Sequence, residues 1–197
     1  MKEFTESLTA TQRILILLLG VKNLEPIINH LRLQKEFFYS LLLMAKDQKE
    51  KEELLEDSGF YPHKVGPYSE TLEEDVEQLS LANVVEYKST VKRAENIKLT
   101  GKGKEVFDYL IKQTPEELIK ILEESKDFLN DKNITDEEVL AIIYELEKEY
   151  TSKSDVIKLI KKNKLKYAVS LYKKGKISIE RAAEIAGMSV SEFKNFL

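Results

Sequence analysis

The sequence predicts a mainly α-helical fold. Apolar residues recur at helical spacing along most of the chain, and Ser or Thr residues stand where several of these patterns begin, as helix N-caps do. Only two adjacent segments have the composition of β-strands, and a short polar turn separates them. Together these observations predict a chain of helices with one small β-hairpin.

Composition excludes several classes of function. The chain has 197 residues, enough for one large domain or two small ones. It contains no cysteine, which excludes disulfides, thiolate catalysis and cysteine-bound metals. Its two histidines, His30 and His63, lack the spacing of metal ligands, and the segment TGKGKE lacks the spacing of a phosphate-binding P-loop. We therefore expect no enzyme, no metal site and no cofactor.

The longest apolar run, Ile14–Val21, has eight residues and is too short to span a bilayer. No cationic segment precedes it, and no cleavage site of small residues follows such a segment. We expect a cytoplasmic protein without membrane contact.

Three helices are expected in the first part of the chain. Thr9 or Thr11 can cap a helix over Gln12–Val21, which the following Asn and Pro residues end or redirect. A longer pattern over Leu33–Leu55 has apolar residues close to helical spacing and a charged tail. The third helix is expected within residues 71–85, where three apolar residues repeat at i, i+4 and i+7.

Two strands follow the third helix. The segments VVEYKS and AENIKL are expected to pair around the polar turn TVKR, and Thr100 can cap the next helix, Lys104–Lys112. Three helices, a hairpin and a fourth helix are the element order of a winged helix-turn-helix domain, which we assign to residues 1–113. The wing carries three cations that could contact phosphate, Lys88, Lys92 and Arg93.

Residues 114–152 are expected to form a helical extension. Pro115 suits the start of a helix over Glu116–Leu129, and another helix is expected over Glu137–Tyr150. Exposed apolar faces on these two helices are candidate interfaces of a homodimer. The polar segment TSKS at 151–154 is the predicted boundary with the next domain, because the charge of the chain changes sign there.

Residues 60–71 read FYPHKVGPYSET and hold two of the four prolines of the chain. We expect this stretch to aim and start the third helix. Gly66 and Pro67 give a sharp turn, Ser69 is a good N-cap, and Tyr61 and Tyr68 can pack beside the turn. Direct contact of the stretch with a ligand or a partner is the alternative.

Four motifs in the same order resemble those of prokaryotic, archaeal-type winged-helix regulators, a group related in pattern to the Panacea domain of bacterial antitoxins. The resemblance covers residues 10–155 and implies the winged helix-turn-helix fold. The motifs are RLQKEFFYSLLL, GFYPHKVGPYSETLEEDVEQL, IKLTGKGKEVFDYL and LAIIYELEKEYTSKSDV.

The third helix, the expected recognition helix of that fold, is unsuited to DNA. Its segment ETLEEDVEQ carries five acidic residues and no basic one. Because neutralisation of phosphates supplies most nonspecific affinity for DNA, this helix would be repelled from a major groove. We expect it to face a protein or solvent, so a protein-interaction module that binds a basic, toxin-like partner is one of two hypotheses for function.

Positive charge gathers in the last quarter of the chain. Residues 153–176 contain nine lysines and one acid, a net of +8, and residues 177–197 carry two basic and three acidic residues, a net of −1. The net charge of the whole chain is −4, so residues 1–152 carry −4 − 8 + 1 = −11. A basic segment on an acidic body is a charge pattern typical of nucleic-acid binding.

The segment Lys164–Leu197 has the spacing of a helix-turn-helix. Small residues, Ala182 and Ala183, lie inside the first expected helix, Gly187 takes the turn, and spaced apolar residues follow. Ser178 can cap the first helix, and Ser189 with Glu192 matches a capping box for the second. The segment also resembles small prokaryotic helix-turn-helix proteins grouped with antitoxins. We assign residues 153–197 to this lysine-rich domain.

The leading hypothesis is a DNA-binding transcriptional regulator, an antitoxin-like autoregulator that binds double-stranded DNA as a homodimer. One short recognition helix contacts few base pairs and gives little sequence specificity. A homodimer that binds two half-sites contacts twice as many. A helical hairpin used only for packing is the alternative for residues 153–197. The expected DNA contacts are the cations Lys161, Lys162, Lys164, Lys166, Lys176 and Lys194 and the polar residues Ser189, Ser191 and Asn195.

Overall fold

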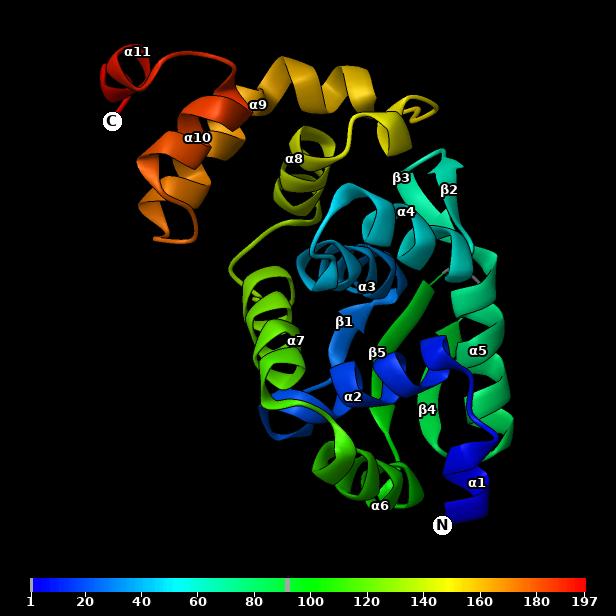
Figure 1. The fold of residues 1–197 in the computed structure, drawn as a ribbon. Coiled ribbons are helices and arrows are strands. Elements are labelled where there is room, and N and C mark those ends of the chain that lie inside the picture. The colour runs from blue at the N-terminus through cyan, green and yellow to red at the C-terminus, as the bar shows by residue number, and fades with distance from the viewer. Residues whose placement is uncertain (1, 91–92) are drawn as a thin grey trace. The chain divides into compact units, whose positions relative to one another are not determined.

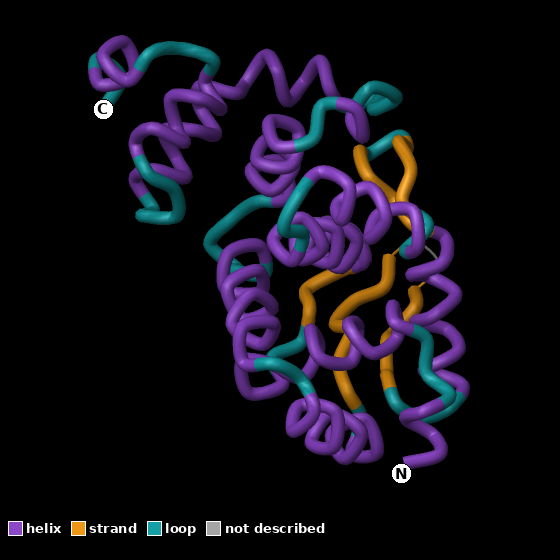
Figure 2. The backbone as a smooth tube through the Cα atoms, viewed as in Figure 1, coloured by secondary structure: helices purple, strands orange, loops and turns teal. Residues whose placement is uncertain are grey.

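The computed structural model describes residues 2–90 and 93–197. They divide into two compact units, the first made of Met1–Phe60 and Ser69–Asn130, the second of Tyr61–Tyr68 and Asp131–Leu197. Helices dominate the described residues, as the sequence predicted (Figure 1, Figure 2). The units meet in the sequence after Phe60, Tyr68 and Asn130. The domain limits expected at 113 and 152 stay predictions for functional domains.

The first unit, called unit 1 below, combines helices with a small sheet. Strands β1 (Ile27–Asn29), β4 (Val85–Thr90) and β5 (Arg93–Leu99) form an antiparallel sheet in the order β1-β5-β4. The predicted hairpin is therefore present, and part of its turn, Val91 and Lys92, lies outside the described residues. The helices are α1 (Lys2–Glu6), α2 (Ala10–Leu24), α3 (His30–Met44), α4 (Gln48–Asp57), α5 (Glu70–Leu81), α6 (Gly101–Leu110) and α7 (Glu116–Leu129), with a 3-10 turn over Ile111–Gln113.

Local side-chain caps set where several of these helices begin. Of the two candidate caps of α2, Thr9 and Thr11, the structure has Thr9, in a capping box with Gln12, and Thr100 caps α6 as the sequence predicted. The single helical pattern expected over Leu33–Leu55 is wrong, because the structure has two helices there. The side chain of Asp47 accepts a hydrogen bond from the Glu50 amide at 2.9 Å, which starts α4 as a new helix.

The core of unit 1 lies between its helices and its sheet. Helix α7 packs against both α2 and α3, and α2 and α3 both contact β5. The interior is made of large apolar side chains that are fully buried, including Leu15, Ile16, Leu18, Leu33, Phe37, Phe38, Leu41 and Ile97.

Unit 1 also buries several charged side chains. Arg32, Lys35 and Glu36 on α3 and Lys126 on α7 are almost inaccessible to solvent. The Lys126 ammonium donates to the carbonyl oxygens of Leu18, Leu19 and Val21 at 3.1, 3.0 and 3.0 Å, and Arg32 donates to the Leu129 carbonyl. Lys126 therefore satisfies carbonyls at the point where α2 kinks.

Burial shifts the ionisation of these groups. It raises the pKa of Glu36 to about 8, with Lys126 and Arg32 acting in the opposite direction. It lowers the pKa of Lys35 to about 7 and that of Lys126 to about 8. Neither carboxylate oxygen of Glu36 has a hydrogen-bond partner among the described residues. Burial thus moves the pKa values of these three interior groups toward neutrality.

The second unit, called unit 2, consists of helices and most of one short β-hairpin. Strands β2 (Phe60–His63) and β3 (Gly66–Ser69) form a two-stranded sheet, and residues 61–68 of this hairpin belong to unit 2. The remaining elements are α8 (Asp136–Leu146), a 3-10 turn over Glu149–Thr151, α9 (Ile157–Lys173), α10 (Ile179–Ala186) and α11 (Val190–Lys194). The helix expected over Glu137–Tyr150 ends early, at Leu146.

The apolar faces expected to be exposed on the two extension helices are largely buried, which corrects that expectation, while the homodimer itself stays a prediction. On α7, Leu122 and Leu129 are fully buried because this helix packs on α2 and α3. On α8, the apolar side chains over residues 139–144 are buried, and α8 packs on α9 and α10. A sequence shows that a helix face is apolar but not which neighbour covers it.

The stretch FYPHKVGPYSET forms the β2–β3 hairpin and the start of α5. The Tyr61 and Tyr68 rings lie 5.8 Å apart, and the Ser69 hydroxyl accepts a hydrogen bond from the Leu72 amide at 2.9 Å, which confirms the predicted N-cap. Gln34 on α3 holds Ser69 by a pair of 2.9 Å hydrogen bonds, one to each backbone polar group. The LQK and GPYS motifs are therefore physically connected.

The tip of the hairpin is bound within unit 2. The Lys64 carbonyl accepts hydrogen bonds from the Asp155 amide at 2.9 Å and from the Ser154 hydroxyl at 3.2 Å. Gly66 adopts a φ of 82°, a conformation that favours glycine, where the chain turns into β3. Across the residues described, no helix is both long and apolar enough to cross a bilayer.

Candidate nucleic-acid interface

Helix α9 carries its lysines on two different faces. Lys158, Lys162 and Lys166 follow one another at i, i+4 and i+8, so they share one face, and all three are exposed. None of them has an ion-pair partner among the described residues. The opposite side of the helix is anchored in the core of unit 2 by Ile160, Ala168 and Leu171, which are buried. The exposed face is thus a row of three unpaired cations on a fixed helix.

Two short helices follow α9, and their ends form as the sequence predicted. The Ser178 hydroxyl caps α10, which ends at Gly187 with a left-handed φ of 71°. The Ser189 hydroxyl accepts from the Glu192 amide at 3.2 Å, and the Ser189 amide donates to the Glu192 carboxylate at 2.8 Å. This capping box starts α11 two residues after the glycine turn.

Close packing fixes α10 against its neighbours. Ala182 and Ala183 are buried, so small side chains lie where α10 contacts α9. Phe193 of α11 is fully buried, and its ring meets that of Tyr172 on α9 edge to face with 6.2 Å between centroids. The three helices therefore form one packed group.

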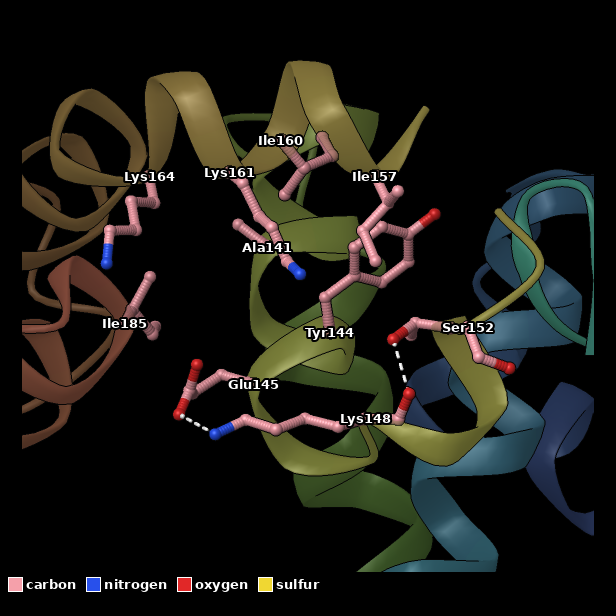
Figure 3. Close-up of a pocket in the computed structure, with 11 residues that line it drawn as sticks. Ala141, Tyr144, Glu145, Lys148, Ser152, Ile157, Ile160, Lys161, Lys164 and Ile185 are labelled. Carbon is pink, nitrogen blue, oxygen red and sulfur yellow. Dashed lines mark hydrogen bonds and ion pairs between the residues drawn. The ribbon is translucent and has the colours of Figure 1, made fainter. Parts of the chain in front are cut away.

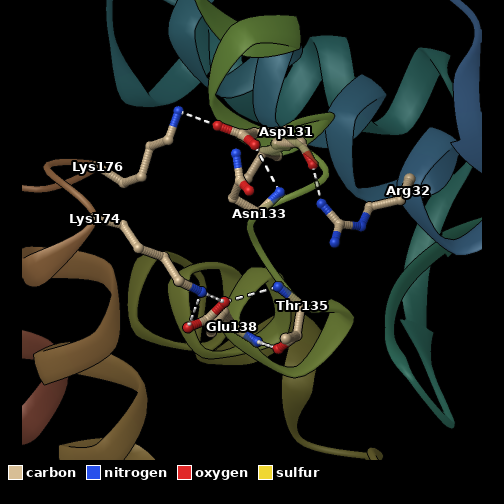
Figure 4. A network of polar contacts seen from close by, with 8 residues as sticks. Arg32, Asp131, Asn133, Thr135, Glu138, Lys174 and Lys176 are labelled. Atoms are coloured by element: carbon tan, nitrogen blue, oxygen red, sulfur yellow. Dashed lines mark hydrogen bonds and ion pairs between the residues drawn. The ribbon is translucent and has the colours of Figure 1, made fainter.

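Two of the lysines that follow α9 are bound in ion pairs rather than presented to solvent (Figure 4). Lys174 donates to both carboxylate oxygens of Glu138 at 2.8 Å, and Lys176 pairs with Asp131. Burial opposes ionisation of Glu138, but the Lys174 hydrogen bonds and others outweigh it and lower the pKa of Glu138. The hydrogen bond from Lys176 is the main cause that lowers the pKa of Asp131.

The predicted DNA contacts fall into three groups. Lys162, Lys166, Ser191, Lys194 and Asn195 are exposed. Ser189 is exposed as well, but its hydroxyl already serves the capping box, and Lys176 would have to leave Asp131 to reach a phosphate. Lys161 and Lys164 line a pocket within unit 2, where Lys161 is also exposed and Lys164 is half-buried.

Sequence reasoning missed Lys158. It completes the exposed face of α9, and its i, i+4 spacing with Lys162 could have identified it. The sequence did not single it out, because lysines are so frequent in this segment that several different faces of the helix would each contain a row of them.

The expected wing is described only in part. Lys88 lies in β4 and Arg93 in β5, and Lys92 lies outside the described residues. In the portion of the chain that is described, no group of three or more His, Cys, Asp or Glu side chains could hold a metal ion.

The acidic face of α5 is smaller than its sequence indicates. Glu70, Glu74 and Glu77 are exposed, whereas Asp75 is buried and accepts a hydrogen bond from Gln12 at 2.8 Å. Burial raises the pKa of Asp75, and the Gln12 hydrogen bond acts against this shift. One of the five acids is therefore structural.

Comparison with known proteins gives one match, over the segment that holds these helices. Residues 145–197 match the model of an uncharacterised protein family, UPF0175. No curated protein and no solved structure matches the chain. The matched segment includes α9, α10 and α11.

Proposed function

We propose that the protein binds double-stranded DNA through unit 2 and acts as a cytoplasmic transcriptional regulator, an antitoxin-like autoregulator. The observation that carries the proposal is the row of exposed, unpaired lysines on α9, Lys158, Lys162 and Lys166, directly before two short, capped helices. Neutralisation of phosphates by such cations is the main source of sequence-independent affinity for DNA.

In this proposal α10 and α11 are a helix-turn-helix, and α11 reads the DNA. Gly187 makes the turn, and the exposed residues Ser191, Lys194 and Asn195 face base edges or the backbone. Because α11 spans only five residues, Val190–Lys194, it reaches few base pairs. We therefore also propose that a homodimer binds two half-sites.

Unit 1 has features that support the interpretation as a winged helix. Its order α2, β1, α3, α5, β4, β5 and its sheet order β1-β5-β4 fit that domain, with α4 and the β2–β3 hairpin inserted before α5. On this interpretation α5 is the recognition helix, and the archaeal-type, Panacea-related pattern applies to unit 1.

A second candidate function is binding of a basic, toxin-like protein by α5. The exposed acids of this helix, Glu70, Glu74 and Glu77, would meet a basic partner, and Leu81 at the end of the same helix is 89% exposed. An exposed leucine beside three carboxylates favours a protein surface over DNA as the partner of α5.

A salt titration tests the DNA proposal. We expect Lys162→Gln with Lys166→Gln in the full chain to weaken binding to random and specific duplexes alike. The log–log slope of affinity against salt should fall by about 0.9 for each phosphate that the variant no longer neutralises. The matched control is Lys46→Gln with Lys49→Gln, which removes the same charge from exposed positions of unit 1.

The same titration separates positioning from base reading. Asn195→Ala should change the preference among duplex sequences by about 1–3 kcal/mol and leave the salt slope nearly unchanged. If the α9 double variant and the unit 1 control have equal effects, the lysine row is only a solvated face. The protein-binding function of α5 then becomes the better proposal.

A further inference from the structure

A pocket of about 640 Å³ lies within unit 2 (Figure 3). It is formed by α8, the 3-10 turn over Glu149–Thr151, α9 and α10. Its volume falls within the range of about 300–1,000 Å³ that is typical of sites for small molecules. Neither the row Lys158, Lys162 and Lys166 nor helix α11 lines it, so it is distinct from the proposed DNA-reading surface.

One part of the pocket wall is apolar. Ala141 on α8, Ile157 and Ile160 on α9 and Ile185 on α10 line it. Figure 3 places these side chains around the same space, which they approach from three different helices. Such a wall holds the apolar body of a ligand by excluding water from it.

The other part of the wall is positively charged. Three lysines and one glutamate line the pocket, a net of 3 − 1 = +2, and Glu145 pairs with Lys148 at 3.2 Å. The remaining cations, Lys161 and Lys164, have no ion-pair partner among the residues that the structure describes. Their ammonium groups point from α9 into the space between α8 and α10 (Figure 3).

Lys164 is held in this position by the end of α10. A side chain in place of the hydrogen of Gly187 would collide with the Lys164 ammonium group, so the two are in close contact. The C-terminus of a helix carries a partial negative charge that favours a nearby cation. This explains the placement of Lys164, but it supplies no counter-charge for Lys161, one turn earlier on the same wall.

We propose that this pocket binds a small organic anion, a carboxylate attached to an apolar body. Lys161 and Lys164 hold the carboxylate, and the isoleucine wall of the pocket holds the apolar body. The single negative charge of a bound carboxylate offsets one of these two positive charges beside the lysine row of α9, so it weakens the attraction of that helix for phosphate. This last consequence rests on the proposed DNA-binding function, whereas binding of the anion does not.

The test uses 4-phenylbutyrate as the probe and its uncharged analogue 4-phenylbutan-1-ol as the matched control. Both are titrated into the ¹⁵N-labelled full chain and followed by NMR. We expect saturable shifts for amides of residues that line the pocket, with a Kd on the order of 1 mM or tighter for a ligand of about a dozen non-hydrogen atoms. The alcohol should bind at least about tenfold more weakly, because it lacks the charge.

Two pairs of variants locate the charge that matters. Lys161→Gln with Lys164→Gln should weaken binding of 4-phenylbutyrate by roughly tenfold or more and leave binding of the alcohol unchanged. Lys153→Gln with Lys173→Gln removes the same charge from exposed positions of unit 2 outside the pocket and should leave both ligands unaffected. Dispersed amide spectra of all variants establish that each is folded.

Several results overturn the proposal. Absence of saturable shifts at the pocket, equal binding of acid and alcohol, or equal losses in the two double variants would each do so. A DNA titration with 4-phenylbutyrate present tests the consequence separately. If the anion binds the pocket but does not weaken DNA binding, the anion site is supported and its coupling to DNA is refuted. If the chain binds no DNA at all, the proposed function is refuted and the anion site is still supported.

Discussion

The two units carry charge of opposite sign, and they carry it in different places. Unit 1 has 17 basic and 24 acidic residues, a net of −7, and unit 2 has 14 and 11, a net of +3. Among the described residues, unit 1 buries five charged side chains, and unit 2 buries only Glu138, which Lys174 pairs. Unit 1 thus places part of its charge in its interior, where it bears on stability, whereas the described charge of unit 2 lies almost wholly outside its core.

Two of the helices that follow serine caps, α5 and α11, also differ in the charge around them. Ser69 starts α5, and Ser189 starts α11, by the same type of hydrogen bond from an amide three residues later. The solvent face of α5 is acidic, whereas α11 packs through Phe193 against Tyr172 of the lysine-rich helix α9. The same type of cap therefore starts helices whose surroundings differ in charge, because the charge of a surface is independent of the cap.

The largest effect is expected from the interior of unit 1. Lys126→Met removes the donor to three carbonyls and the cation near the buried Glu36. We expect the free energy of unfolding to fall by about 3–5 kcal/mol, the usual cost of breaking a buried charged network. Urea denaturation followed by circular dichroism measures it.

Lys120→Met on the same helix is the control. Lys120 is exposed and pairs with Glu116 at 2.8 Å across one helical turn, so its loss should change the free energy by less than about 0.5 kcal/mol. Equal effects of the two substitutions would show that the buried ammonium is not a structural element, and the contrast between the units would fail.

A smaller effect concerns the pH dependence of stability. Burial lowers the pKa of Lys35 from 10.5 to about 7, so between these values the unfolded chain holds a proton that the folded chain has lost. Stability of the parent protein should therefore rise with pH across this window, relative to Lys35→Met, by at most about 1.4 kcal/mol per pH unit. The difference in unfolding free energy between the two proteins, measured at pH 7, 8 and 9, tests this.

The direction in which the stability difference between the parent protein and Lys35→Met changes with pH shows whether burial lowers the pKa of Lys35. Lys35→Met has its greatest advantage near pH 7, where folding forces the parent lysine to lose its proton or be buried charged, and loses that advantage as the pH rises toward 10.5. Parallel stability curves for the two proteins would mean that Lys35 remains solvated in the folded state.

The smallest effect is expected in unit 2, where local caps rather than buried charges organise the helices. Ser189→Ala removes the cap of α11 and should cost about 1 kcal/mol, whereas Ser189→Asn keeps an acceptor and should cost little. Ser191→Ala, at an exposed position of the same helix, should change stability by less than about 0.5 kcal/mol. Hydrogen exchange of the α11 amides reports the effect, and equal exchange in Ser189→Ala and Ser191→Ala would contradict it.

Features whose physical cause lies within a few residues could be predicted from the sequence. The caps Thr9, Ser69, Thr100, Ser178 and Ser189 were identified because a cap and its partner are three residues apart. The glycine turn at Gly187 and the β4–β5 hairpin are local in the same sense. The predominance of helix could be predicted from these caps and from apolar residues that recur at helical spacing.

The remaining features depend on residues that are distant in the sequence. Strand β1 was missed because its three residues gain their pairing only from β5, and the bonds of Gln34 to Ser69 cross 35 positions. In α9 the sequence determined that lysines are abundant, but it could not separate Lys162 and Lys166 from Lys161 and Lys164. Only the packing of α8 and α10 against α9 decided which lysines line a pocket, because this depends on the neighbours that lie beside a helix face and not on the residues within it.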